Sequence, residues 1–144
     1  MADLNKKTSG YSGFLLKIGD YTVPTDKFIS AESYSVTYNV MDLDSYRDAN
    51  GKLHREALAH VPIKVEFETP AMLTDITFGQ ELMGNIRRNY TNAKERKCIA
   101  TAYIPELDSY VTQEVYMVTP TAQIYGNYGG RLHYKPIRMA FVGY

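Results

Sequence analysis

The dipeptide Asn50-Gly51 constrains the fold more than any other feature of this chain, because Asn-Gly is the strongest short signal for a β-hairpin. A type I′ turn needs positive φ at both central residues, and Asn-Gly tolerates that conformation best. An alternating apolar arm lies on each side of the dipeptide: Tyr34, Val36, Tyr38 and Val40 before it, and Val61, Ile63, Val65 and Phe67 after it. We therefore predict one long extended hairpin over about residues 34–67.

Charged residues fill the stretch between the arms and the turn: Asp42, Asp44, Arg47, Asp48, Lys52, His54, Arg55 and Glu56. A tip of this kind costs conformational entropy and buries little of itself, so we interpret it as a surface that contacts another molecule. The N-terminal arm, residues 1–13, is polar and is expected to be flexible, and it is a second candidate for contacts. The candidate subunit-interface residues on the tip are Arg47, Asp48, Lys52, His54 and Arg55.

The rest of the chain predicts a single mainly β domain over residues 14–144. Short alternating strands follow one another between glycine and proline turns, and one amphipathic segment predicts a helix over about residues 77–90. Thr77 reads as the start of a capping box, with Thr74 as an alternative start. The glycine-dense stretch 126–130 is expected to be a hairpin loop. This pattern fits an antiparallel β-sandwich or barrel with one flanking helix.

Composition narrows the class of partner. Sixteen basic and sixteen acidic residues give zero formal net charge, which argues against nucleic acid as the main partner. The single cysteine, Cys98, lies in an apolar run and is expected to be buried and inert. The N-terminus lacks the features of a secretory signal, and no apolar run approaches the ~20 residues of a membrane span. We therefore expect a soluble protein, made in a reducing cytoplasm, with no membrane partner.

Catalytic and metal-binding patterns are weak. His54 and His60 are six residues apart and have no third ligand nearby, so they are a poor metal signal. Asp42, Asp44 and Asp48 alternate as in a calcium loop, but the glycine and glutamate that such a loop needs are missing. We predict a protein that is not an enzyme, with no catalytic residue, no cofactor and no metal.

Three segments carry a resemblance to a known family: Leu16-Lys-Ile-Gly followed by Val23-Pro, Asp44-Ser-Tyr-Arg47 followed by Asn50-Gly-Lys-Leu-His-Arg55, and Val65-Glu-Phe67. Over about residues 14–68 the chain resembles short phage and prophage proteins encoded among tail genes. The resemblance implies a virion structural protein with a fold similar to tail-tube and distal-tail proteins. Those proteins form rings whose sheets line a lumen and whose loops reach the next ring.

The resemblance thus predicts a homo-oligomeric ring, expected to be hexameric, located in the tail of a virion and made in the cytoplasm of a bacterial host. Its partners would be further copies of the chain and other tail proteins, with DNA only in transit through the lumen. An alternative function is a carbohydrate- or receptor-binding β-sandwich that uses Tyr125, Tyr128 and Tyr134. A hydrolase with convergent carboxylates is a third hypothesis.

Overall fold

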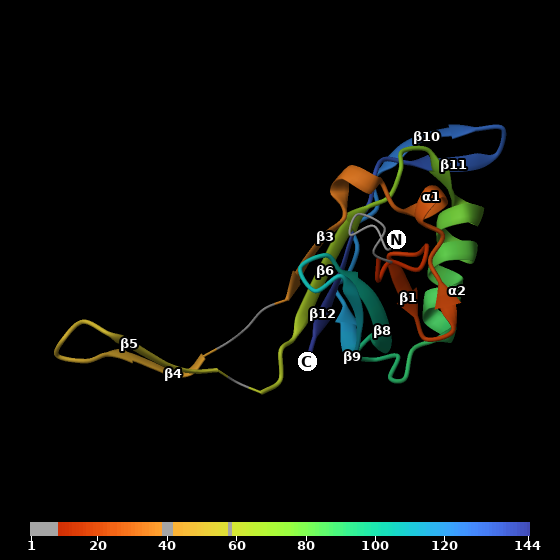
Figure 1. Ribbon diagram of the computed structural model, residues 1–144. Helices are drawn as coiled ribbons and strands as arrows, with labels where there is room; N and C mark the ends of the chain where they lie inside the picture. The colour runs from red at the N-terminus through yellow and green to blue at the C-terminus, as the bar shows by residue number, and fades with distance from the viewer. Residues whose placement is uncertain (1–8, 39–41, 58) are drawn as a thin grey trace, which may run out of the picture.

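The computed structural model describes residues 9–38, 42–57 and 59–144, and this part of the chain is mainly β with antiparallel sheets (Figure 1). The predicted fold class is confirmed, since β-strands dominate and one main helix flanks them. The helical segments are α1 (Thr25–Phe28), η2 (Ala31–Ser33), the π-helical η3 (Asp75–Leu82) and α2 (Met83–Arg88). None of the helices in the described ranges is long and apolar enough to cross a lipid bilayer.

The main sheet has seven strands in the order β2-β1-β8-β9-β12-β6-β3. Their bounds are β1 Leu16–Ile18, β2 Tyr21–Thr22, β3 Ser35–Tyr38, β6 Ile63–Glu68, β8 Lys97–Ile104, β9 Ser109–Met117 and β12 Arg138–Gly143. Strand β8 alternates between half-buried and fully buried residues, as a strand with one face on a core should. The prediction of a buried Cys98 is confirmed, because this residue lies on the buried face of β8.

One hydrophobic core fills the space between the buried face of this sheet and the helical segments. Figure 1 shows the η3–α2 helix alongside the β1 end of the sheet. The largest fully buried side chains come from both parts of the chain: Phe28, Phe67, Phe141, Leu16, Ile18, Ile63, Leu82, Ile86, Ile104, Met117, Ile137 and Met139. The alternating arm predicted around Val65 forms β6, whose three buried side chains are Ile63, Val65 and Phe67.

The main helix begins at Asp75, so the alternative start near Thr74 is the one that forms. Thr74 keeps an extended backbone as N-cap, and its Oγ1 accepts the N–H of Thr77 at 3.2 Å. Thr77 Oγ1 in turn accepts the N–H of Thr74 at 2.7 Å, which completes a reciprocal capping box. Thr77 therefore occupies the third position of the helix instead of its start.

A second, smaller sheet has the order β10-β11-β7, with bounds β7 Leu73–Thr74, β10 Ile124–Tyr128 and β11 Arg131–Tyr134. The stretch 126–130 is not a loop throughout, because β10 continues to Tyr128 and only two residues form the turn. Gly129 and Gly130 have φ of 60° and 77°, the double positive φ of a type I′ turn. The ring of Tyr128 lies over Gly126, where an added Cβ would come within 2.8 Å of the ring.

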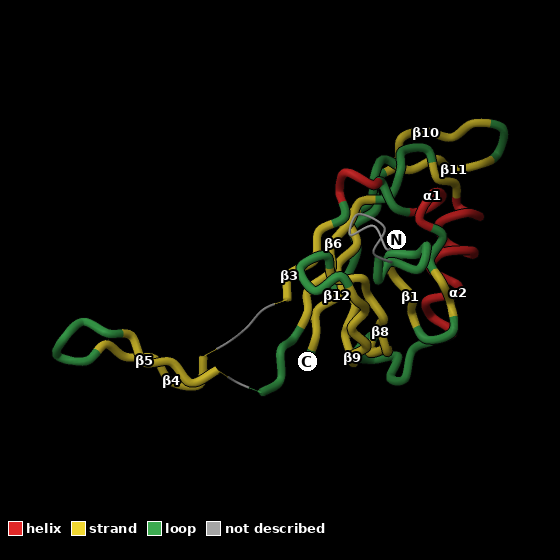
Figure 2. The backbone as a smooth tube through the Cα atoms, viewed as in Figure 1, coloured by secondary structure: helices red, strands yellow, loops and turns green. Residues whose placement is uncertain are grey.

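A third sheet consists of two strands, β4 (Asp42–Arg47) and β5 (Leu53–Ala57), which pair only with each other. Below them, β3 pairs with β6 in the main sheet, with Val36 opposite Val65. The extended hairpin predicted over about residues 34–67 is therefore present, with β4 and β5 as its outer part (Figures 1 and 2). Val40, one of the predicted arm residues, lies outside the described ranges.

Candidate assembly interface

We call residues 42–57 the distal hairpin, because they project far from the core of the molecule (Figure 1). Its strands pair from Asp42 opposite Ala57 to Arg47 opposite Leu53, with one irregularity between Asp42 and Asp44. A two-stranded ribbon covers neither of its own faces, and Tyr46 and Leu53 remain 57% and 42% exposed. The hairpin therefore exposes apolar as well as charged side chains at its surface.

The loop of the distal hairpin is wider than the sequence predicts. Asp48 accepts the N–H of Gly51 and donates its own N–H to Lys52, both at 2.9 Å, which closes a three-residue loop. Only Gly51 has a positive φ, 82°, while Asn50 does not. The predicted type I′ turn at Asn50-Gly51 is thus wrong, and the geometry is that of a turn followed by a glycine bulge.

Asp48 explains this geometry. Its Oδ1 accepts the N–H groups of Asn50 and Lys52 at 3.0 and 2.9 Å. Its Oδ2 lies 2.9 Å from His54 Nε2. The hydrogen bond from His54, and next that from Lys52, hold the pKa of the Asp48 carboxyl below its usual value. This carboxylate is directed into the hairpin and fixes its shape.

The five residues predicted for the interface have different roles. Asp48 holds the loop, and His54 both contacts it and stacks on the ring of Tyr46, with 4.9 Å between ring centroids. Arg47 Nη1 donates to the carbonyl of Gly51 at 3.0 Å. Lys52 has an exposed side chain at the tip, while Arg55 lies one residue pair further toward the body than His54.

Sequence reasoning missed Tyr46 and Leu53, the exposed apolar residues of the distal hairpin. The sequence did contain a signal for them. Both are large apolar residues in an otherwise charged stretch, and a tip surrounded only by water has no use for such residues. The structure shows that the other described parts of the chain leave both side chains largely exposed.

A second exposed hairpin is formed by β10 and β11. Tyr128 lies between two other rings, with centroid distances of 6.5 Å to Tyr125 and 5.4 Å to His133. Tyr134, the third tyrosine singled out in the sequence, is half-buried and packs edge-on against Phe78 at 5.6 Å. The exposed apolar side chains of this hairpin are Ile124, Tyr125, Tyr128 and Leu132.

The two exposed hairpins leave the body at opposite ends of one strand pair. Strands β6 and β12 are antiparallel neighbours, with Glu68 opposite Arg138 at one end and Lys64 opposite Val142 near the other. The distal hairpin precedes β6 and so departs from the Lys64 end, whereas the β10–β11 hairpin precedes β12 and departs from the Arg138 end. Figure 1 shows them on opposite sides of the molecule.

Part of the N-terminal arm is bonded to the turn between β8 and β9. The carboxylate of Asp108 accepts the N–H of Gly10 and the hydroxyl of Ser9, both at 3.1 Å. The hydroxyl of Tyr103 donates to the same carboxylate at 2.5 Å. The hydroxyl of Tyr110 accepts the N–H of Ser12 at 2.8 Å and donates to the carbonyl oxygen of Phe14 at 2.7 Å. The arm is therefore attached to the body from Ser9 onward.

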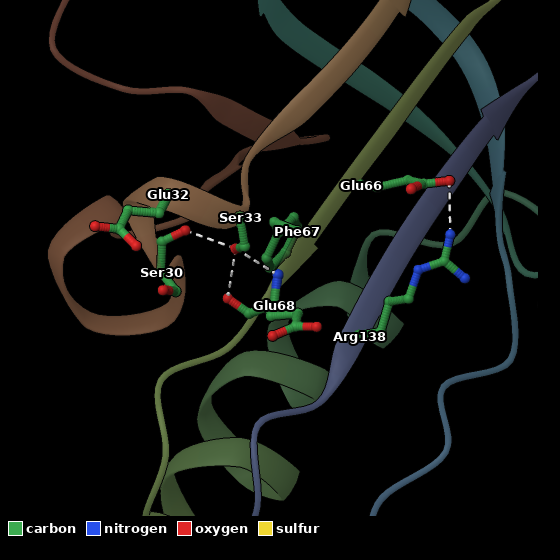
Figure 3. A pocket seen from close by; sticks show the side chains of 7 residues that line it. All are labelled: Ser30, Glu32, Ser33, Glu66, Phe67, Glu68 and Arg138. Carbon is green, nitrogen blue, oxygen red and sulfur yellow. Dashed lines mark hydrogen bonds and ion pairs between the residues drawn. The ribbon is translucent and has the colours of Figure 1, made fainter.

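A polar depression lies beside the end of β6, where its residues bind mainly one another (Figure 3). Glu66 accepts from Lys64 at 2.8 Å and from Arg138 at 2.7 Å, and these two bonds lower the pKa of its carboxyl. Ser33 Oγ donates to the carbonyl of Ser30 at 2.6 Å and accepts the N–H of Glu68 at 2.7 Å. A carboxylate held ionised by two cations is a poor proton donor, so this arrangement favours a structural role. The lining residues are Ser30, Glu32, Ser33, Glu66, Phe67, Glu68 and Arg138.

The two histidines that formed the weak metal signal in the sequence have other contacts. His54 contacts Asp48, and His60 Nε2 contacts the carbonyl oxygen of Tyr144. Among the residues that the structure describes, no group of three or more His, Cys, Asp or Glu side chains is placed to hold a metal ion. Burial raises the pKa of the Cys98 thiol to about 11, which keeps it protonated at neutral pH.

Comparison with known proteins gives a family and a fold. A model described as a family of unknown function, DUF6711, matches residues 7–144. No curated protein matches the chain. Among solved structures, a chain from the tail of an empty GTA particle with C6 symmetry is 14% identical, with a TM-score of 0.52, and the match covers 92% of this chain and 91% of that one.

Two further structures are more distant. A chain of the anti-feeding prophage cap, the AFP tube terminating cap, is 12% identical with a TM-score of 0.43 and coverage of 99% and 95%. A chain of the PVC sheath-tube complex, from an extracellular contractile injection system in the extended state, is 11% identical with a TM-score of 0.45 and coverage of 100% and 95%.

Proposed function

The chain belongs to the DUF6711 family, whose function is unknown, and we propose that it is a structural protein of a phage or prophage tail. It acts by assembling into rings of identical copies that stack on one another. Its function is to bind other protein subunits, and it catalyses no reaction. The protein is located in the tail of the particle, and it is synthesised in the cytoplasm of the bacterial host.

The distal hairpin is the observation that carries this proposal. An isolated two-stranded ribbon is marginally stable in water, and this one projects with Tyr46 and Leu53 exposed. Its loop is nevertheless specified by the side chain of Asp48. A shaped projection with uncovered apolar residues is suited to a partner that completes it. In a stack of identical rings, the next ring supplies that partner through a heterologous contact.

The fold supports the same proposal. The chain from the GTA tail shares the fold along nearly the whole of both chains, and that tail has C6 symmetry. Six copies per ring are the stoichiometry that we carry over to this protein. Other tail proteins would contact the terminal rings of a stack, and DNA would meet the protein only in transit through the lumen.

Light scattering on the purified protein across a concentration series tests this function. We expect the mass to reach that of a ring and then to grow as rings stack, with electron microscopy showing rings or tubes. A strict monomer, both alone and when mixed with the other tail proteins of its particle, would contradict the proposal.

A shortened hairpin separates stacking from folding. Replacement of residues 46–54 by Asn-Gly joins Ser45 to Arg55, which face each other across the hairpin, through a two-residue turn. We expect this variant to keep the thermal unfolding temperature of the body but to stop before stacks form. Ala49→Ser is the matched control, because it changes the same loop without altering its length. Stacking of the shortened variant at the wild-type concentration would count against the proposal.

A further inference from the structure

We propose that the β10–β11 hairpin is the docking surface for the distal hairpin of a second copy of the chain in the adjacent ring. This inference rests on the proposed function and names the partner surface within it. The docking surface consists of Ile124, Tyr125, Tyr128 and Leu132, together with the cations Arg131 and Lys135.

Geometry provides the first step. The two hairpins depart from opposite ends of the β6–β12 strand pair, so they lie on opposite sides of the body within one copy (Figure 1). When identical copies stack head to tail, the end that carries the distal hairpin faces the end that carries the β10–β11 hairpin of the next copy. The two surfaces then meet between copies.

Exposed apolar surface provides the second step. On the distal hairpin Tyr46 is 57% exposed, and on the β10–β11 hairpin Tyr125 and Tyr128 are 57% and 55% exposed. Aromatic side chains that stand uncovered on a projecting ribbon are typical of protein interfaces. The position of Tyr128 is also specified, because its ring needs the space that Gly126 leaves and contacts His133. The docking surface is therefore organised before a partner arrives.

Charge provides the third step. Residues 119–136 include two cations, Arg131 and Lys135, and no Asp or Glu. Arg131 Nη1 lies 3.6 Å from Asp75 Oδ2 at the start of the main helix, whereas Lys135 has an exposed side chain. Residues 42–57 include four carboxylates against three cations. Opposite net charges of this kind orient two surfaces and set their register. A second copy thus offers apolar side chains that can cover those of the β10–β11 hairpin, together with a net charge of the opposite sign.

Cross-linking tests the contact directly, because the one natural cysteine, Cys98, is fully buried. One chain carries Lys52→Cys at the distal tip, and another, with a tag that changes its size, carries Asn127→Cys on β10. With a short bismaleimide we expect cross-linked heterodimers when the two are mixed, and far fewer cross-links from either alone. Tip-to-tip dimers from Lys52→Cys alone, without heterodimers in the mixture, would overturn the inference.

A double variant, Tyr125→Ala with Tyr128→Ala, tests the aromatic surface. We expect the concentration at which rings stack to rise at least ~10-fold, with the mass of the single ring unchanged. Leu107→Ala is the matched control, because Leu107 is an exposed apolar residue (42% exposed) in the β8–β9 turn. Circular dichroism verifies that each variant is folded.

The outcomes separate this inference from the proposed function. If the wild-type chain stacks, but the double variant stacks equally and no heterodimers form, the docking surface is wrong and the proposed function stands. If the wild-type chain forms no stacks, either alone or mixed with the other tail proteins of its particle, and the two cysteine variants form no heterodimers, both are rejected. If the double variant stacks normally but loses binding to a glycan array that the wild-type protein shows, the tyrosines serve a carbohydrate and the inference is overturned.

Discussion

Asp48 Oδ2 and His54 Nε2 lie 2.9 Å apart across the loop of the distal hairpin, so one side chain joins the loop to the strand that leaves it. The other oxygen of the same carboxylate accepts two backbone N–H groups, those of Asn50 and Lys52. The side chain of Asp48 thus adds three contacts within the hairpin to the two backbone hydrogen bonds that close the loop.

Asp48→Ala is expected to loosen the loop and leave the body intact. Amide hydrogen exchange at Asn50 and Lys52 should become several-fold faster, because both N–H groups lose their acceptor. Asp48→Asn is the matched control, since its amide oxygen still accepts these bonds while the negative charge beside His54 is lost. Unchanged exchange in the alanine variant would show that the backbone hydrogen bonds alone specify the loop.

Attachment of the N-terminal arm should depend on pH through Asp108. Hydrogen bonds to its carboxylate, first from Tyr103 and then from Gly10, hold the pKa of this group below its ordinary value of 3.8. Because the folded pKa is depressed, the stabilisation is present above pH 3.8 and is lost as the pH falls through the lower folded value. Proteolysis of the arm should therefore be slow at neutral pH and rise only in that acidic window.

The variant Asp108→Asn should remove this pH dependence and expose the arm to protease at neutral pH. Gly10→Ala should also detach the arm, since an added Cβ would come within 1.8 Å of the backbone oxygen of Asp108. Ser9→Ala removes only one of the three hydrogen bonds to the carboxylate and should have the smallest effect. An arm that stays protected in Asp108→Asn would contradict the role assigned to this carboxylate.

Removal of the helix cap should destabilise the whole protein modestly. Thr74→Ala leaves the N–H of Thr77 without its side-chain acceptor, which should lower the free energy of unfolding by about 1 kcal/mol. Thr74→Ser keeps the hydroxyl and should cost far less. Urea denaturation followed by circular dichroism measures both, and equal loss in the two variants would mean that packing of the Thr74 methyl group matters more than the cap.

Truncation of a core ring should be much more severe. Phe141 is fully buried on β12, so Phe141→Ala should cost about 3–5 kcal/mol through lost burial and an unfilled cavity. Leu107→Ala, in an exposed turn, should change the free energy of unfolding by less than about 0.5 kcal/mol. Denaturant unfolding of the two variants beside the wild type provides the comparison.

The strands of the core could be predicted from sequence because their signal is local. Val65 and its neighbours alternate strictly, and a strand with one buried face imposes that period. The start of the helix was ambiguous, because Thr74 and Thr77 both fit a cap and only the reciprocal bonds decide between them. The turn type predicted at Asn50-Gly51 was wrong, because the side chain of Asp48 favours a wider loop than the dipeptide alone does.

The contacts of the candidate site were harder to predict, because they join residues that are far apart in the sequence. Nothing near Gly10 in the sequence indicates that its N–H binds Asp108, 98 residues away. The stretch 126–130 has the composition of a loop, yet strand β10 continues through it to Tyr128, whose ring lies over Gly126. That the two exposed hairpins face opposite ways follows only from the order of strands in the sheet.

The placement of these hairpins on neighbouring strands has a mechanical consequence. If copies stack through these hairpins as we propose, a pull along the stack would enter one copy at β6 and leave it at β12, in the direction of the strands. The five residue pairs from Glu68–Arg138 to Lys64–Val142 would then be loaded in shear, all at the same time. Peeling would instead break such pairs one after another under a smaller force. In the proposed stack, the β6–β12 ladder would thus be oriented to resist tension along its strands.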